Sequence, residues 1–462
     1  MIALILILLP LVVGTLLFLL PREEKTISKV VGTLVAGAIV VIAFVSHGEE
    51  WTYRWLAHPF VANFHFGATY LSHWLVVLLS LCTFGAVLAT NVPRARSMIA
   101  ALLLLEGTMA GLFLARDLLV FALFWDAMLL PVFFVLLSWG PHPSVAWRYF
   151  IYNFAGGLVL LLAVAAFGAI FGTTDVIGNP AYHGIVSVWA PWILAGFVLA
   201  FLVKTPVWPL HTWMPATYEA TPAPMVAVVS GVQSKAGLYG LLAIAFAIFP
   251  TYLSAEVPVL IVLAIVSLLY GAFVALVQAD VKLVVAYSSL SHLGLVLLAI
   301  VSLDATALQG ALLYIVAHGL FSAALFLILG YVEEREGTRA LGRLGGLGWT
   351  NPRITGAFCI AALALLGLPG LAGFAGELII LIGVFAAGYG WAAILALVAI
   401  VTASAYTLRL LQGATQGAEK PELPVRADLT WREGLAVAPL LAALLYFGVY
   451  PHALLAAGWL HP

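Results

Sequence analysis

Five charged residues stand inside long runs of apolar residues, where their side chains could bind or transfer protons. They are the acids Glu106, Asp126 and Glu377 and the bases Lys204 and Lys235. At the centre of a membrane helix, such a lysine or aspartate costs about 2.5–3.5 kcal/mol on insertion scales. Pairing of opposite charges, or contact with water, offsets this cost, and intramembrane ionisable residues usually mark ion or proton sites. We therefore predict a buried path of titratable groups, with charge pairs that only lock helices together as the alternative.

Two histidines extend this set of titratable residues. His292 follows Ser288 by about one helical turn, and Tyr314, His318 and Ser322 recur every four residues, so that they share one helical face. Because histidine titrates near neutrality, both residues suit a proton relay. Two alternatives stay open, namely core histidines bonded to neighbouring hydroxyls and a pair of axial haem ligands. The haem reading fits less well, because polar residues crowd both sites where a porphyrin needs an apolar pocket.

Prolines interrupt two of the apolar runs beside these charges. Pro206 and Pro209 follow Lys204, and Pro369 precedes Glu377 within a glycine-rich stretch. Proline removes a backbone donor, and irregular backbone at membrane depth is tolerated only inside protein or beside a watery cavity. A break next to a charge in two separate segments is typical of inverted repeats with sites at the membrane midplane.

The composition identifies the elements that must hold these residues. The chain has 462 residues, of which 64% are hydrophobic and 8% are charged, whereas soluble domains carry about 25% charged residues. This excludes a disordered chain and a nucleic-acid-binding protein. Cys82 and Cys359, the two cysteines, are too few for an iron–sulfur cluster on four thiolates, and we expect no bound metal or cofactor.

Apolar stretches of roughly 20 residues recur along the whole chain, and each is long enough to cross a hydrocarbon core of about 30 Å. Since backbone groups in lipid must be satisfied internally, these stretches must be helices. We predict an all-α polytopic membrane protein with about fourteen transmembrane helices and no strands. The predicted spans lie near 1–21, 30–46, 69–91, 97–115, 118–138, 148–172, 189–213, 224–249, 256–279, 283–301, 307–331, 354–386, 390–411 and 433–456.

The order of these spans predicts two five-helix repeats of opposite orientation, each containing a broken helix. The first repeat covers 97–249 and the second 250–411. Residues 1–96 supply three preceding helices, and residues 412–462 supply a cytoplasmic loop and the last helix. With alternate loops assigned to opposite sides, 15 of the 19 lysines and arginines fall on one side, and only Arg54 and Arg116 fall on the other. The positive-inside rule therefore predicts that both termini face outward.

Several segments resemble the antiporter-like membrane subunits of respiratory complex I, the proton-pumping NADH:quinone oxidoreductase. Among these subunits the similarity is to the M-type chains, the bacterial counterparts of mitochondrial subunit four. The similar segments occur in the family's order over most of the chain, from about 97 to 411. They read ARDLLVFALFWDAMLLPVFF, FLVKTPVWPLHTWMPATYEATPAP, SKAGLYGLL, VKLVVAYSSLSHLG, HGLFSAALFLILGYVEEREGTR and LGLPGLAGFAGELIIL.

The resemblance implies a role for each buried group. Lys204 would be the proton-binding lysine on the broken helix, Asp126 the acid that tunes it, and Glu377 the terminal site. Lys235, His292 and His318 would form the polar axis between them. From the residue pattern itself, we expect Glu106, Tyr314 and Ser288 to support this set. Glu377 favours an M-type chain, because the L and N chains and sodium/proton antiporters usually carry lysine there. Asp126 departs from the family's usual glutamate and is shorter by one methylene.

The resemblance also implies the setting in which the chain works. We expect a proton-translocating subunit in the inner (plasma) membrane of a bacterium, in contact with lipid and with L-like and N-like chains on either side. Redox chemistry in other subunits would drive it, and the chain itself would bind neither NADH nor another cofactor. A subunit of a Na⁺/H⁺ antiporter, a subunit of a membrane-bound hydrogenase and a structural membrane scaffold are the alternatives. Whether H⁺ or Na⁺ moves stays open.

Overall fold

The computed structural model describes residues 1–20, 25–46, 48–417 and 427–455. Within these ranges, twelve helices are long and apolar enough to cross a membrane, and three shorter apolar helices accompany them. The predicted helical, polytopic fold is confirmed, and the chain is a multi-pass membrane protein. Residues 418–426 of the predicted cytoplasmic loop, and residues 456–462 after the last helix, lie outside the described residues. The division into four predicted segments, with boundaries after residues 96, 249 and 411, stays a prediction.

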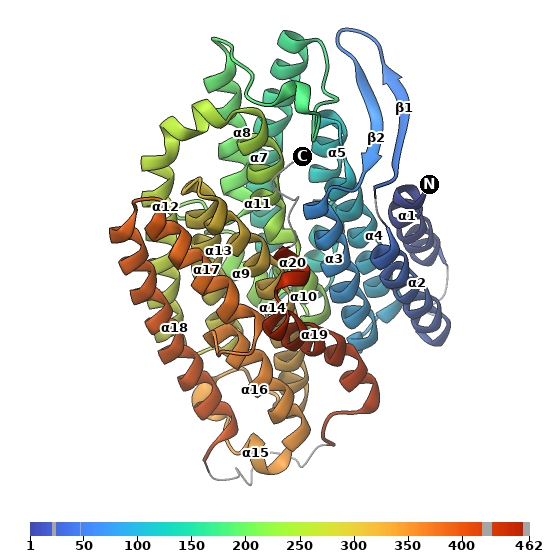
Figure 1. The fold of residues 1–462 in the computed structure, drawn as a ribbon. Coiled ribbons are helices and arrows are strands. Elements are labelled where there is room, and N and C mark those ends of the chain that lie inside the picture. Colours follow the sequence, from blue (N-terminus) through green and yellow to red (C-terminus); the bar gives the residue numbers. More distant parts are fainter. Residues whose placement is uncertain (21–24, 47, 418–426, 456–462) are drawn as a thin grey trace. The chain divides into compact units, whose positions relative to one another are not determined.

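The described chain forms two compact units, whose elements are labelled in Figure 1. Unit 1 contains Met1–Pro206 and Val232–Pro258, and unit 2 contains Val207–Gly231 and Val259–Ala456. The elements of unit 1 are α1 (Ile2–Leu19), α2 (Lys25–Val45), β1 (Glu50–Leu56), β2 (Ala62–Gly67), α3 (Tyr70–Ala89), α4 (Ala95–Leu114), α5 (Leu118–Ala127), α6 (Leu129–Trp139), α7 (Pro143–Phe171), η1 (Pro180–Tyr182), α8 (Ala190–Lys204), η2 (Gln233–Lys235), α11 (Ala236–Gly240) and the π-helix η3 (Leu241–Phe246).

Helix α12 (Pro250–Val277) begins in unit 1 and ends in unit 2. The other elements of unit 2 are α9 (Met214–Ala220), α10 (Ala223–Gly231), α13 (Val281–Val301), α14 (Ala305–Glu336), η4 (Leu341–Arg343), α15 (Leu347–Thr350), α16 (Pro352–Leu366), α17 (Ala372–Ala386), α18 (Gly390–Thr415), α19 (Trp431–Val449) and α20 (His452–Leu455).

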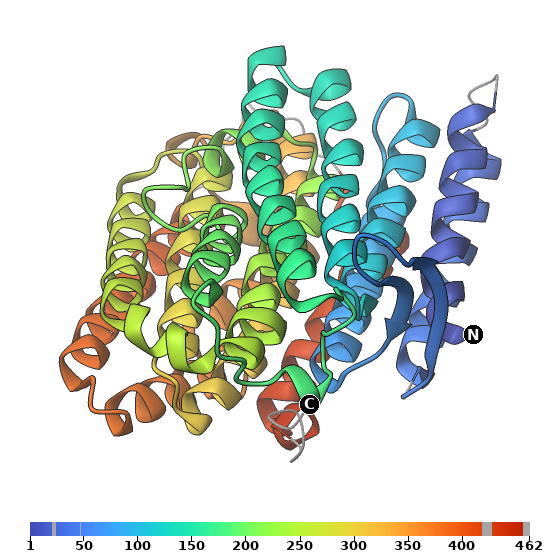
Figure 2. The same cartoon turned by 90° about the horizontal axis from the view of Figure 1, so that it is seen from above.

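Each unit is built around a buried helix. In unit 1, α4 packs against α1, α2 and α3, and Figure 2 shows α1 and α2 as neighbours. Gly107 lets α1 and α4 approach closely, because a Cβ added there would lie 2.8 Å from the carbonyl oxygen of Ile7. In unit 2, α14 is buried over its whole apolar window and packs against α10, α13, α16, α17 and α19.

The expectation of no strands is wrong. Strands β1 and β2 form an antiparallel hairpin in unit 1, with Glu50 opposite Gly67 and a register shift between Arg54 and Leu56. Aromatic side chains recur at every second position of β1, where Trp51 and Tyr53 stack with ring centroids 6.3 Å apart. Such period-two alternation favours a strand, and it is too short to appear as an apolar run of helix length.

Two of the predicted spans are interrupted next to a charge. Helix α8 ends at Lys204, and residues 205–213, which include Pro206 and Pro209, form turns before α9 begins. The span predicted near 354–386 comprises two helices, α16 and α17, separated by a non-helical segment that contains Pro369. Each interruption frees backbone groups and places them beside a buried ionisable side chain.

Candidate proton-transfer sites

Lys204 is the last residue of α8, and its side chain is only 1% exposed. Its Nζ lies 5.1 Å from the centroid of the Trp125 ring on α5, within the range of a cation–π contact. Asp126 follows Trp125 in sequence and interacts electrostatically with Lys204. Among the described residues, however, neither Lys204 Nζ nor Asp126 Oδ1 has a hydrogen-bond partner. The acid and the base are therefore neighbours without direct contact, as the short aspartate side chain would produce.

The carboxylate of Asp126 lies against the backbone of Gly157 on α7. A Cβ added to Gly157 would overlap Asp126 Oδ1, so this glycine makes room for the acid. A larger residue must push the carboxylate aside or separate α5 from α7. The position of Asp126 beside Lys204 thus depends on the absence of a side chain at Gly157.

We expect Gly157→Ala to displace the Asp126 carboxylate and to lower proton translocation while the protein still folds. Overpacking of this kind costs about 1–3 kcal/mol, and the flexible end of one side chain can absorb part of it. The measurement is the translocation rate in membrane vesicles at matched protein content. Gly356→Ala is the control, because a Cβ at Gly356 meets nothing within 4 Å. Equal rates in the two variants would contradict the expectation.

Lys235 lies where helix α10 gives way to a short 3₁₀ turn, η2. Its side chain is fully buried, with Nζ 3.3 Å from Ser234 Oγ. Gln233 anchors the turn in unit 1 by donating to the carbonyl oxygen of Met128 at 3.1 Å. Helix α11, which follows, packs tightly on α8, because Gly237 abuts the backbone of Phe201. The two buried lysines are therefore on adjoining elements of the same unit.

Glu106 on α4 is fully buried in unit 1. Among the described residues, neither of its carboxylate oxygens has a hydrogen-bond partner. Burial is the influence that acts on Glu106, whereas Asp126 also interacts electrostatically with Lys204. Its role as a supporting group stays a prediction.

Glu377 on α17 is 5% exposed and follows the break between α16 and α17. The hydroxyl of Tyr314 on α14 donates a hydrogen bond of 2.7 Å to Glu377 Oε1. Gly367, which ends α16 with φ of 79°, lies against Oε2, and a Cβ there would overlap this oxygen. Both carboxylates beside the helix breaks, those of Asp126 and Glu377, are thus packed against glycines.

The two histidines belong to the same part of unit 2 as Glu377. The rings of His292 on α13 and His318 on α14 have centroids 5.7 Å apart, and those of His292 and Tyr314 are 5.8 Å apart. Both histidines are nearly fully buried. Ser288, one turn before His292, uses its hydroxyl to donate to the carbonyl oxygen of Val285 at 2.8 Å. The structure therefore brings His292, His318, Tyr314 and Glu377 into one cluster.

Sequence reasoning missed the residues that pack around these groups. Trp125, which faces Lys204, and Tyr406 of α18, whose hydroxyl lies 3.4 Å from His292 Nε2, carry no charge and stand in apolar runs. Trp125 could have been noticed because it directly precedes Asp126. Tyr406 gave no such signal, since its partner lies 114 positions earlier in the chain.

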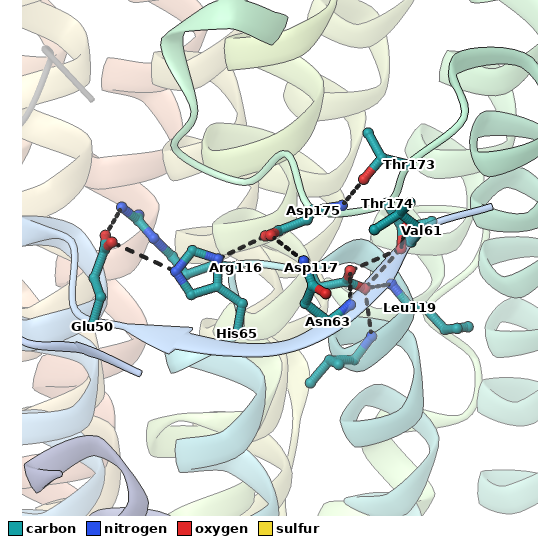
Figure 3. Close-up of polar contacts among 11 residues, drawn as sticks. Glu50, Val61, Asn63, His65, Arg116, Asp117, Leu119, Thr173, Thr174 and Asp175 are labelled. Carbon is teal, nitrogen blue, oxygen red and sulfur yellow. Dashed lines mark hydrogen bonds and ion pairs between the residues drawn. The ribbon is translucent and has the colours of Figure 1, made fainter. Parts of the chain in front are cut away.

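A polar cluster in unit 1 joins the hairpin to the start of α5 (Figure 3). His65 Nδ1 of β2 lies 2.7 Å from Asp175 Oδ1, and its Nε2 lies 3.5 Å from Glu50 Oε2 of β1. Arg116 donates to Glu50 Oε1 at 2.9 Å. Asp117 accepts hydrogen bonds from two backbone amides in the first turn of α5 and so caps that helix. These contacts fasten the hairpin outside the membrane-spanning helices.

The charges of this cluster favour a protonated His65. The hydrogen bond to Asp175 outweighs burial and raises the pKa of His65 above its ordinary value of 6.5. Burial acts to raise the pKa values of Glu50 and Asp175, but hydrogen bonds from Arg116 and His65 outweigh it, so both lie below their ordinary values of 4.5 and 3.8. Both acids therefore stay ionised above about pH 5.

We expect the hairpin to loosen as the pH rises. Because the pKa of His65 is raised in the folded protein, protonated His65 contributes fully to the stability of the hairpin below pH 6.5. This contribution is lost as the pH rises through the higher pKa of the folded state. Hydrogen–deuterium exchange of residues 50–67, corrected for intrinsic rates, should show protection that declines as the pH rises above 6.5 and through the raised pKa of His65. His65→Gln should remove that decline. The same pH course in the wild type and the variant would contradict the expectation.

Comparison with known proteins shows the family to which the chain is similar. Residues 115–403 match the family model described as NADH:quinone oxidoreductase/Mrp antiporter, TM. The chain is 34% identical over 373 residues to NADH-quinone oxidoreductase subunit M of Rhodobacter capsulatus, covering 78% of this chain and 73% of that relative. It is 32% identical over 484 aligned positions to subunit M of Pseudomonas aeruginosa, covering 97% and 94%.

A solved structure is similar over the whole length. A chain in the structure of respiratory complex I from Thermus thermophilus with bound NADH matches with a TM-score of 0.89 and 32% identity. The match covers 100% of this chain and 98% of that chain. The similarity therefore extends over both units.

Proposed function

Because this chain belongs to the NADH:quinone oxidoreductase/Mrp antiporter transmembrane family, as an antiporter-like M-type subunit of complex I, we propose that its buried clusters are stations of a proton path. The chain is a proton-translocating subunit of the membrane arm, and other membrane-arm subunits are its partners. The observation that carries the assignment of sites is the burial of Lys204 beside Asp126 at the end of the interrupted helix α8.

The proposed path begins at Lys204. An opposite charge stabilises a charged group, so movement of the Asp126 carboxylate toward or away from Lys204 would change how tightly the lysine holds its proton. Lys235, on the adjoining α11 side of unit 1, is the proposed next acceptor. The path continues in unit 2 through His292 and His318 to Glu377, whose Oε1 accepts the hydrogen bond from Tyr314.

The energy for this transfer would come from redox chemistry in other subunits. We infer that this chain takes part in the oxidoreductase as a non-redox subunit and binds no cofactor of its own. We further place it in a bacterial inner membrane, with both termini outside and with L-like and N-like chains as neighbours. Arg54 of β1 and Arg116, which the loop count puts on the outer side, both belong to the hairpin region of unit 1.

A cation/proton antiporter is the second candidate, because the matching family model includes Mrp antiporters. The acid at Glu377 supports the complex I assignment, since the antiporter relatives usually carry lysine there. A membrane-bound hydrogenase would share the lysines and the broken helices. The three assemblies differ in the subunits that accompany this chain and in the reaction that drives the ion.

Purification of the intact complex through a tag on this chain tests the proposal. We expect mass spectrometry to identify the subunits of an NADH:quinone oxidoreductase. In proteoliposomes, NADH oxidation by an added quinone should then drive proton uptake that does not require Na⁺, as a pH-sensitive dye can report. Hydrogenase subunits in the purified complex, or Na⁺/H⁺ exchange without an electron donor, would contradict the proposal.

A further inference from the structure

Tyr406 of α18 is a fully buried residue in unit 2 that the proposed proton path does not include. Its hydroxyl lies 3.4 Å from Nε2 of His292 on α13. Ser288, one turn before His292, also interacts with the Tyr406 hydroxyl. The tyrosine therefore reaches across from α18 to the face of α13 that carries the histidine.

Tyr406 also interacts electrostatically with residues of the cluster around Glu377. It interacts with the carboxyl group of Glu377 on α17 and with Tyr314 on α14. Helix α18 packs against both α13 and α17, which holds the tyrosine ring in place. The titratable groups facing His292 are thus Tyr406 from α18, His318 and Tyr314 from α14, and Glu377 by way of the Tyr314 hydroxyl.

We propose that Tyr406 is a positioning residue that keeps Nε2 of His292 directed toward α18 and the Glu377 cluster, both when the imidazole holds a proton and when it has lost one. The inference rests on the proposed function, because it concerns a residue of the same path. It adds to the path an uncharged residue that the sequence analysis did not predict. It also assigns helix α18 a role in proton transfer.

The chemistry of a hydroxyl suits this task. When His292 Nε2 is unprotonated, the Tyr406 O–H can donate to its lone pair, and when Nε2 carries a proton, the same oxygen can accept from the N–H. The tyrosine gains and loses no proton in the cycle, because its O–H bond only rotates. The partner at one ring nitrogen fixes which nitrogen carries the proton, so loss of the hydroxyl would free the ring to turn. A separation of 3.4 Å is at the long end of the hydrogen-bond range, and the contact can shorten when the imidazole becomes charged.

Tyr406→Phe in the intact complex removes the hydroxyl and keeps the ring. Tyr331→Phe is the matched control, because Tyr331 is a buried tyrosine of α14 whose hydroxyl has no hydrogen-bond partner among the described residues. We expect assembly in both variants and a proton-translocation rate about threefold to tenfold lower in Tyr406→Phe alone, the range set by one hydrogen bond. The pH profile of translocation should also move in Tyr406→Phe and not in Tyr331→Phe.

Identical rates and pH profiles in the two variants would overturn the proposal. Glu377→Gln, measured in parallel, distinguishes failure of the proposed proton path from failure of the proposed role of Tyr406. Normal translocation in Glu377→Gln would refute the proposed path, whereas loss in Glu377→Gln with no effect of Tyr406→Phe would refute the role of Tyr406 alone.

If Tyr406→Phe does not assemble, infrared difference spectra of the wild-type complex provide the test. With ring-labelled tyrosine, NADH-induced turnover should give a tyrosine C–O band that His292→Gln abolishes. Absence of such a band, or its persistence in His292→Gln, would overturn the proposal.

Discussion

Replacing Lys204 with methionine should abolish proton translocation while the complex still assembles. Methionine fills a similar volume and keeps contact with the Trp125 ring, but it cannot bind a proton. Removal of one essential acid–base group lowers a rate by about a hundredfold or more.

The measurement is NADH-driven proton uptake by proteoliposomes that contain the purified complex at matched protein content. Lys25→Met is the control, because Lys25 is an exposed residue at the start of α2. Uptake at the wild-type rate in Lys204→Met would show that Lys204 is not a proton carrier.

The second large effect is expected for Glu377→Gln. Glutamine keeps the shape of the side chain, and its amide oxygen can still accept the 2.7 Å hydrogen bond from Tyr314. The packing of the carboxyl group against Gly367 should also be preserved. Because glutamine cannot exchange a proton, we expect translocation to fall on the same scale as in Lys204→Met, about a hundredfold or more.

The same proteoliposome assay measures this effect, and Glu256→Gln, an exposed position on α12, is its control. Wild-type uptake in Glu377→Gln, with normal subunit composition, would remove Glu377 from the path. A loss of assembly in Glu377→Gln would instead mean that the acid supports the break between α16 and α17.

The sequence predicted much of this fold because the membrane imposes a simple rule. Apolar runs of sufficient length must be helices, and prolines next to Lys204 and Glu377 indicated where α8 ends and where α16 and α17 separate. The hairpin β1–β2 escaped prediction because it lies outside the lipid-spanning segments, where aromatic alternation rather than apolar length determines the structure.

The charged residues of the candidate sites could be predicted from the sequence, whereas the uncharged residues around them could not. Lys204, Asp126 and Glu377 are conspicuous because a charge in an apolar run is costly. Three other residues are uncharged, so placing them in an apolar run carries no comparable cost. Gly157 and Gly367 make room for the two carboxylates, and Tyr406 contacts His292. Their importance depends on packing between segments that are distant in sequence, and no local pattern encodes this.

The double variant Asp126→Leu/Lys204→Met tests the central claim most directly. Replacing two neighbouring buried charges of opposite sign with apolar residues of similar size is often neutral or stabilising, so the complex should assemble whether these charges are structural or functional. The decisive quantity is the number of protons translocated per NADH oxidised in proteoliposomes. A proton path through Lys204 predicts a ratio clearly below that of the wild-type complex. A ratio equal to wild type would show that the two charges only hold helices together, and would contradict the account.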